Sequence, residues 1–246
     1  MLNFSPITRR RWAQFQANKR GYWSLWLFLF FFTMAMLANV IANDKPILVV
    51  YKKAVFLPIL KSYPEKTFGG DFETETDFRD PYVSDLIAKD GWMIWPPIKY
   101  TYDTINYNLP TPAPSPPTND NILGTDDQGR DVFARVLYGF RLSVLFGLSL
   151  TLFSSLIGVI AGAFQGFYGG KVDLIAQRVI EIWSSLPSLY ILIIFSALFV
   201  PGFWTLLFIL LLFSWTHLVD VVRAEFLRAR SLDYVRAARA LGVGNI

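Results

Sequence analysis

The stretch LSVLFGLSLTLFSSLIGVIAGAFQGFYGG, residues 142–170, contains no charged side chain and decides the fold. It exceeds the about 20 apolar residues that a helix needs to cross a membrane, and Arg141 and Lys171 stand at its two ends. Small residues recur along it about one helical turn apart, at Ser143, Gly147, Thr151, Ser155, Gly158, Gly162 and Gly166. Small side chains at that spacing let another helix pack closely in lipid, so we predict a span over about 142–166 inside a helical bundle.

The composition of the whole chain is that of an integral membrane protein. Of the 246 residues 53% are hydrophobic, and the 8 tryptophans and 22 phenylalanines suit lipid-facing and interfacial surface. The net charge is only +4, but the basic and acidic residues lie in different parts of the chain. The absence of cysteine excludes disulfides and thiolate-bound metals, and a single histidine, His217, argues against a histidine-clustered metal site. We expect no cofactor, metal, catalytic residue or nucleic-acid partner.

The beginning of the chain predicts a first membrane span. Residues 1–21 are basic, and residues 22–42 carry no charge. At about 1.5 Å per residue, the uncharged run is long enough to cross a hydrocarbon core of about 30 Å. Positively charged flanks stay in the cytoplasm, so we place the N-terminus there. The run exceeds the usual core of a signal peptide, and we expect an uncleaved anchor rather than a cleaved or twin-arginine export signal.

Residues 43–138 form a long polar segment, which alternation places in the periplasm. We expect strand-like pieces at Ile47–Tyr51 and Ile98–Tyr102. Its carboxylates have the spacing of no known metal loop, so a solvated acidic face is favoured over a calcium or catalytic cluster. The acids concerned are Asp71, Glu73, Glu75, Asp77, Asp80 and Asp85. The turn-rich stretch Leu123–Asp131 is expected to form a structured turn at the membrane surface, because a calcium loop would need a terminal glutamate.

A second uncharged run, Ile182–Thr216, would be roughly 50 Å long as a single helix, far more than a bilayer needs. Pro201-Gly202 divides it, which predicts a helical hairpin with spans over about 182–200 and 203–221. Pro187 is expected to kink the first arm. The ionisable residues at the end of this run allow a polar relay, although interfacial salt bridges are the favoured interpretation. These residues are His217, Asp220, Arg223 and Glu225.

The stretch Ser231–Gly242 predicts a short amphipathic helix. Ser231 is expected to cap its N-terminus, Asp233 suits the first turn of the helix dipole, and Gly242 supplies the stop. Its apolar residues recur at helical spacing, at Leu232, Val235, Ala238 and Leu241. Several alanines keep the helix thin, so that a partner surface can approach closely. The alternative is a helix that lies on lipid beside the last span.

Three parts of the chain resemble the permeases of dipeptide and oligopeptide ABC importers. The segment Leu123–Val132, with Arg135–Gly139 and Arg141–Ser143, resembles the part before the core of these permeases, and Tyr168–Asp173, followed by Arg178 and Leu186–Ser188, is similar to their next loop and helix. Asp233–Gly242 resembles their Glu-Ala-Ala…Gly loop, with Arg236 in the place of the glutamate and with Ala237, Ala238 and Gly242 matching.

The N-terminal half narrows the resemblance to the Yej-type branch of this family, which is associated with the uptake of microcin C. The stretches that carry this narrower resemblance are Arg11–Phe15, Arg20–Trp26, Ile41–Pro46 and Phe68–Gly70.

The resemblance implies an all-α polytopic protein of the bacterial inner membrane, with the type I ABC importer (MetI-like) permease fold. Residues 43–138 would be an insertion after the first span, and residues 139–246 the permease core. Permeases of this type usually have six spans, so the four expected here imply that the last two are missing. The family works as two related permeases with two cytoplasmic ATPase subunits, and a periplasmic binding protein delivers the peptide. This chain would then be a transport subunit and not an enzyme.

The resemblance also assigns a site. The cytoplasmic loop 222–246 would couple the chain to an ATPase through Leu232, Asp233, Tyr234, Val235, Arg236, Ala237, Ala238, Arg239, Leu241 and Gly242. ATP hydrolysis would belong to the partner, because Gly166–Lys171 fails as a Walker loop: Gln165 stands where glycine is needed and Val172 where serine or threonine is needed.

Two other classes of function remain open. A secondary transporter driven by ions would need buried ionisable groups near the middle of the membrane, and none of the four predicted spans has one at that depth. A membrane-anchored periplasmic sensor or assembly protein would act through residues 43–138. An ATPase that accompanies the chain favours the importer over both.

Overall fold

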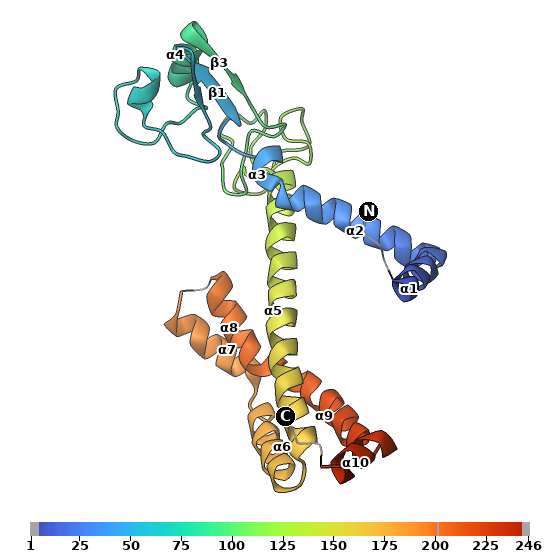
Figure 1. The fold of residues 1–246 in the computed structure, drawn as a ribbon. Coiled ribbons are helices and arrows are strands. Elements are labelled where there is room, and N and C mark those ends of the chain that lie inside the picture. The colour runs from blue at the N-terminus through green and yellow to red at the C-terminus, as the bar shows by residue number, and fades with distance from the viewer. Residues whose placement is uncertain (1–4, 201, 243–246) are drawn as a thin grey trace. The chain divides into compact units, whose positions relative to one another are not determined.

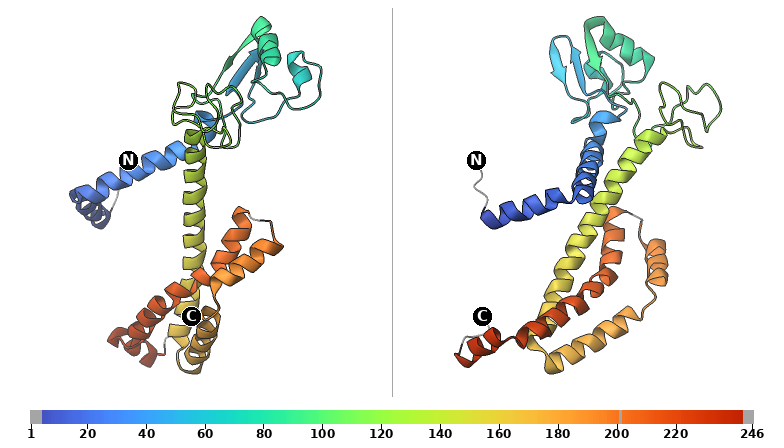
Figure 2. Two further views of the ribbon diagram at one scale, coloured as in Figure 1. Left: turned by 180° about the vertical axis from the view of Figure 1, so that it is seen from behind. Right: turned by 90° about the vertical axis from the view of Figure 1, so that its right-hand side faces the viewer.

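The computed structural model describes residues 5–200 and 202–242 and is mostly helical (Figures 1 and 2). The chain divides into two compact units, Met1–Ser143 and Val144–Ile246. The first unit holds the N-terminal helices and the polar segment, and the second holds the helices of the predicted permease core. The long helix α5, Val132–Tyr168, runs through the boundary between them.

The first unit begins with α1, Pro6–Ala17, α2, Lys19–Met36, and α3, Ala38–Ile41. Asn18 separates the first two helices. Its backbone N–H donates to the last carbonyls of α1, and its side chain accepts a hydrogen bond from Gly21 N at 3.3 Å, which caps α2. The predicted span 22–42 is therefore α2 and α3, with an interruption at Leu37.

The polar segment contains a small sheet, in which β1, Leu48–Tyr51, lies between β2, Ala54–Phe56, and β3, Gly91–Ile94. Both pairings are antiparallel. One face packs on α4, Pro81–Asp90, and on the 3₁₀ turn η1, Glu65–Phe68. The shared core consists of Val49, Tyr51, Phe68, Phe78, Val83 and Ile87.

The strand predicted at Ile47–Tyr51 is present as β1, but the one predicted at Ile98–Tyr102 is wrong. Only Ile98 makes a bridge, to Ala42, and the strand that pairs with β1 comes from the aromatic-rich residues of β3. Pro96-Pro97 ends that strand because proline cannot donate to a ladder. The six acids expected on a solvated face are all exposed.

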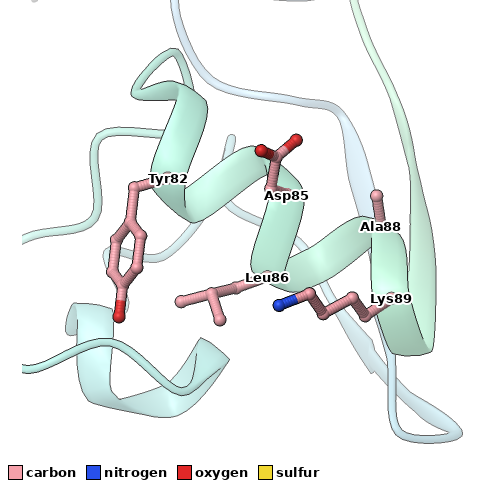
Figure 3. Close-up of a pocket in the computed structure, with 5 residues that line it drawn as sticks. All are labelled: Tyr82, Asp85, Leu86, Ala88 and Lys89. Atoms are coloured by element: carbon pink, nitrogen blue, oxygen red, sulfur yellow. The ribbon is translucent and has the colours of Figure 1, made fainter.

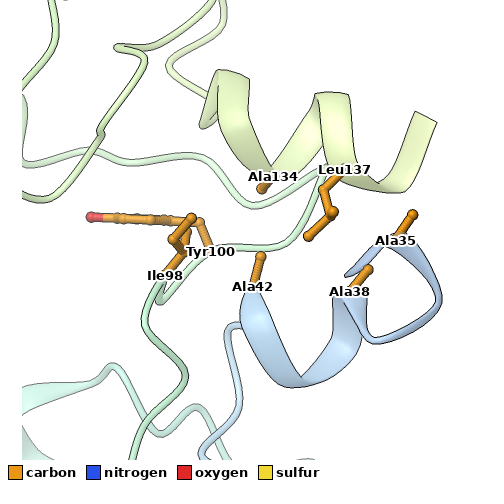
Figure 4. Packing of buried hydrophobic residues seen from close by; sticks show 7 residues of the cluster. All are labelled: Ala35, Ala38, Ala42, Ile98, Tyr100, Ala134 and Leu137. Atoms are coloured by element: carbon orange, nitrogen blue, oxygen red, sulfur yellow. The ribbon is translucent and has the colours of Figure 1, made fainter. Parts of the chain in front are cut away.

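A second apolar cluster joins the ends of helices in the first unit (Figure 4). Alanines from α2 and α3 face the first turns of α5, and their small side chains allow close approach. Two residues of the polar segment, Ile98 and Tyr100, fill the remaining space. Burial of Ile98 and Tyr100 in this cluster explains why they do not continue the sheet. The members are Ala35, Ala38, Ala42, Ile98, Tyr100, Ala134 and Leu137.

The turn expected at Leu123–Asp131 is present and is built on buried amides. Asn106 Nδ2 donates to Asn121 Oδ1 at 2.9 Å, and Asn121 Nδ2 donates to Asp131 Oδ2 at 2.8 Å. The other carboxylate oxygen of Asp131 accepts from Ala134 N at 2.7 Å and so caps α5. This cap starts α5 before the predicted residue 142, at Val132.

The second unit continues with five further helices. They are α6, Gly170–Ser184; α7, Ser188–Leu198; α8, Phe203–Ser214; α9, Thr216–Arg230; and α10, Asp233–Ala240. The kink predicted at Pro187 is a break between α6 and α7, whose axes differ by 65°. The hairpin predicted at 182–200 and 203–221 corresponds to α7 and α8, which extends into α9; Pro201, assigned to its turn, lies outside the described residues.

Two helices in the described ranges are long and apolar enough to cross a membrane, namely Val132–Tyr168 and Phe203–Arg230. A third is obtained if α6 and α7 count as one bent span. The predicted first span, residues 22–42, is not among these helices. Its main part, α2, has 18 residues and begins with the charged residues Lys19 and Arg20. The helix that enters the coupling loop is also longer than expected, since α9 remains helical to Arg230 whereas the loop was predicted from residue 222.

Candidate functional site

The predicted amphipathic helix is α10, and the turn before it is organised differently from the prediction. Ser231 was expected to cap α10, but its hydroxyl group donates to Arg228 O at 2.7 Å and closes α9. The carbonyl oxygen of Leu232 instead accepts from Val235 N and Arg236 N, at 3.0 and 3.1 Å, and begins the new helix. Gly242 has φ +81°, a left-handed conformation suited to a helix stop, as expected.

Most residues assigned to ATPase coupling are exposed. These are Leu232, Asp233, Tyr234, Arg236, Ala237, Leu241 and Gly242. Val235 and Ala238 are partly buried, and the side chain of Arg239 lies outside the described part of the chain. The exposed fraction reaches 70% for Tyr234 and 84% for Leu241. Exposed aromatic and apolar side chains beside a basic helix are typical of a surface that a partner covers.

Three glycines of α5 allow α9 to approach its backbone. A Cβ on Gly158 would lie 2.7 Å from Trp215 O, and a Cβ on Gly162 would lie 2.6 Å from Val219 O. A Cβ on Gly166 would lie 2.5 Å from the Cβ of Phe226. The small-residue stripe therefore packs a second helix over this half, as predicted. Gly147, nearer the start of the stripe, has no neighbouring atom within 4 Å among the described residues.

Polar side chains also attach α6 to α9. Arg223 makes a bidentate ion pair with Asp173, with Nη2 2.7 Å from Oδ2 and Nε on Oδ1. Gln177 Nε2 donates to Asp220 Oδ1 at 3.0 Å and to Gln165 Oε1 of α5 at 3.2 Å. Asp220 and Arg223 are thus both bonded to side chains of α6, and their place at the membrane surface stays a prediction.

The last turns of α9 make two further contacts through charged side chains. Glu225 pairs with Arg228 within α9 at 3.5 Å, with both side chains exposed. Arg230 Nη1 donates to Gly166 O at 3.3 Å. Gly169, with φ +62°, lies so close to Arg230 that any side chain there would meet the guanidinium group. The stretch that resembled a phosphate loop is thus the turn between α5 and α6.

Asp173 and Gln177 are the residues that sequence reasoning missed. Asp173 was noted only as part of a resemblance, and its partner Arg223 lies 50 residues away. The available signal was spacing: a pair of polar residues one turn apart occurs on α6, and another pair, Asp220 and Arg223, occurs on α9. Such pairs on two otherwise apolar helices indicate faces that meet.

Elsewhere the described surface offers little that resembles a chemical site. A hollow of about 430 Å³ lies beside α4, lined by Tyr82, Asp85, Leu86, Ala88 and Lys89 (Figure 3). Its residues do not converge, because Asp85 and Leu86 point to opposite sides of the helix. Within residues 5–200 and 202–242, no three His, Asp or Glu side chains are grouped as metal ligands would be.

Comparison with known proteins agrees with this arrangement. Residues 154–246 match the family model described as "Binding-protein-dependent transport system inner membrane component". The chain is 54% identical to the peptidoglycan transport system permease protein YejE of Agrobacterium fabrum, over 98% of this chain and 70% of the relative. It is 52% identical to the inner membrane ABC transporter permease protein YejE of Escherichia coli, over 100% of this chain and 72% of the relative.

A more distant relative is the oligopeptide transport system permease protein OppC of Bacillus subtilis, 35% identical over 61% of this chain and 48% of that protein. The resemblance to peptide importer permeases, including its Yej-type branch, is thereby confirmed. The chain belongs to the family of inner-membrane permeases of binding-protein-dependent ABC transport systems.

Proposed function

We propose that this chain is a transmembrane permease subunit of an ATP-driven importer that takes up peptides, and that α10 docks on a cytoplasmic ATPase. The observation that carries the proposal is the exposed helix α10, which follows a span packed against both α5 and α6. A rigid support behind an exposed end suits the transfer of movement from a partner.

The proposed topology places the N-terminus and residues 222–246 in the cytoplasm and residues 43–138 in the periplasm. The distribution of charge supports it. Basic residues concentrate before α2 and around α10, whereas most acids lie in the polar segment. The four proposed spans are residues 22–42, about 142–166 within α5, about 182–200, which includes α7, and about 203–221, which covers α8 and the start of α9.

The proposed assembly contains a second homologous permease, two cytoplasmic ATPase subunits and a periplasmic peptide-binding protein. An exposed apolar row along α5 supports the presence of a second permease subunit. Its exposed apolar residues recur one turn apart, at Leu148, Leu152, Leu156 and Ile160. Such a row is covered in the membrane by lipid or by the helix of another subunit.

The proposed substrate class is short peptides. The names of two relatives refer to peptidoglycan and to oligopeptides, respectively, and peptidoglycan itself contains short peptides. We therefore expect both free oligopeptides and peptide-bearing cell-wall fragments to compete for import.

The test is ATP-driven uptake by the full-length permease, reconstituted in liposomes with its partner permease, ATPase and binding protein. We expect uptake of a labelled oligopeptide only with ATP and binding protein, and we expect peptide to stimulate ATP hydrolysis. Ala238→Trp should abolish uptake while membrane insertion persists, and Ala88→Trp on exposed α4 is the matched control. Normal uptake by the Ala238 variant would contradict the proposed role of α10.

A further inference from the structure

Side-chain contacts tie α6 to α9 immediately before α10. They comprise the Asp173–Arg223 ion pair and the Gln177–Asp220 hydrogen bond, which together we name the α6–α9 clamp. The two contacts lie one turn apart on each helix, with the helices running in opposite directions. The clamp thus fixes α6 to α9 at two levels.

The ion pair of the clamp is less exposed than the Arg178–Glu181 pair of the same unit. The side chains of Asp173 and Arg223 are only 14% and 29% exposed, so the pair is largely shielded from solvent. The Arg178–Glu181 pair lies within α6 and is 71% and 56% exposed. Shielded bidentate pairs fix orientation as well as distance, whereas exposed pairs within one helix contribute little.

The clamp is also connected to α5. Gln177 uses one amide nitrogen, which has two hydrogens, to reach both Asp220 and Gln165. The Gln165 side chain is buried, with 3% of the residue exposed. Since α9 is in backbone contact with α5 through Gly162 and Gly166, the three helices meet around one polar centre.

The α6–α9 clamp lies before the break in the bent pair of helices α6 and α7. α6 ends at Ser184, and α7 begins at Ser188 with an axis that differs by 65°. The clamp holds only α6, the part of this pair that precedes the break. A displacement of α9 at the clamp would therefore be passed to α6, while the break would leave α7 free to take a different orientation.

We infer that the α6–α9 clamp is the linkage through which movement of α10 reaches the bent span, with Asp173 and Arg223 as positioning residues for transport. The inference rests on the proposed function, because it needs an ATPase that moves α10. A Lys at position 223 would keep the charge but lose the bidentate geometry.

The test uses the reconstituted full-length complex and measures both peptide import and ATP hydrolysis. We expect Asp173→Ala and Arg223→Ala each to reduce import about tenfold while ATP hydrolysis stays within about twofold of wild type, so that more ATP is consumed per peptide. The exchange Asp173→Arg with Arg223→Asp should restore import to within about threefold, and Arg223→Lys should be intermediate. Glu181→Ala, which removes the exposed pair on α6, is the matched control and should import normally.

A distance measurement separates positioning from stability. Spin labels are attached at Leu174→Cys on α6 and at Val221→Cys on α9. Both positions are exposed, and the 246-residue sequence has no cysteine that would also be labelled. We expect one narrow distance distribution with and without ATP in the otherwise unchanged protein, and a broad one in Asp173→Ala.

Three outcomes overturn the inference: normal import by both alanine variants, a loss of import that the charge exchange does not reverse, or an unchanged label distance in Asp173→Ala. If the clamp variants import normally while Ala238→Trp abolishes import, the clamp inference fails and the proposed function stands. If Ala238→Trp also imports normally, the proposed docking of α10 fails as well, whereas the absence of ATP-driven uptake by the unchanged complex would overturn the proposed import function.

Discussion

The hydroxyl group of Tyr138 donates a hydrogen bond of 2.9 Å to the carbonyl oxygen of Ala42, 96 residues earlier in the chain. It lies 3.0 Å from Asn39 Oδ1 as well, and the guanidinium group of Arg141 lies 4.7 Å from the centre of its ring. The contact joins the end of α3 to the second turn of α5, beside the apolar cluster shown in Figure 4. The hydrogen bond therefore joins the two ends of the polar segment, residues 43–138.

Tyr138→Phe should destabilise the first unit by about 1–2 kcal/mol, because the ring remains but the carbonyl of Ala42 loses its partner. Thermal unfolding of the detergent-solubilised protein measures the change. Tyr107→Phe is the matched control, since Tyr107 is 85% exposed. Equal unfolding temperatures for the two variants would contradict a structural role for the Tyr138 hydroxyl group.

The turn before α5 should make the stability of the fold depend on pH in the acidic range. Burial raises the pKa of Asp126, but hydrogen bonds from the Arg130 backbone and side chain and from Gln128 N, together with the charge of Arg130, lower it to about 2. A lowered pKa in the folded state stabilises the fold above the unfolded pKa of about 3.9, and the contribution disappears as the pH falls toward 2.

We therefore expect Asp126→Asn to cost about 2 kcal/mol of unfolding free energy at pH 7 and progressively less between pH 4 and 2. The control is Asp127→Asn, because Asp127 is exposed in the same turn. Unfolding curves across this pH range test the prediction. A loss that is independent of pH would show that the carboxylate charge is not the cause.

Gly162→Ala should separate α5 from α9. A Cβ at this position would lie 2.6 Å from Val219 O and 2.9 Å from the Cβ of Val222, so the helices must shift. We expect a loss of about 1–3 kcal/mol in stability. Gly147→Ala, which meets nothing within 4 Å, should be neutral or stabilising by up to about 1 kcal/mol, because alanine favours helix. Similar stabilities for the two variants would contradict close packing at Gly162.

Phe68→Ala should loosen the small fold of the polar segment, residues 43–138. Phe68 is fully buried and its ring lies within 6.3 Å of the rings of Tyr51, Phe56, Tyr63 and Phe78. Removing it should cost about 3–5 kcal/mol. Limited proteolysis should then cut within residues 43–138 much faster, whereas Phe72→Ala, at a 63% exposed position, should leave the rate unchanged. Protection of the Phe68 variant equal to that of the control would refute this.

The apolar runs predicted the helices of the second unit because long uncharged stretches have few other structures available in lipid. The glycine stripe also predicted a packed face, which Gly158, Gly162 and Gly166 confirm. The start of α5 was not predicted, because it depends on a cap by Asp131 whose carboxylate is held by the buried side-chain amide of Asn121, ten residues earlier.

Contacts between distant residues account for the other differences. Ser231 caps α9 rather than α10 because the preceding helix continues to Arg230, which local propensity alone does not reveal. Asp173 and Arg223 meet only when two helices pack in one register. The likeness of α10 to the coupling loop of known permeases came from motif residues, and its role remains a proposal.

The most direct measurement of the central claim is photo-cross-linking from the end of α10 in the assembled complex. A benzophenone attached at Leu241→Cys, an 84% exposed position, should form an adduct with the cytoplasmic ATPase subunit. The same probe at Leu60→Cys, an 80% exposed position in the polar segment, should form none. Adducts from position 241 with lipid alone, or labelling of that position by a reagent confined to the periplasm, would contradict the account.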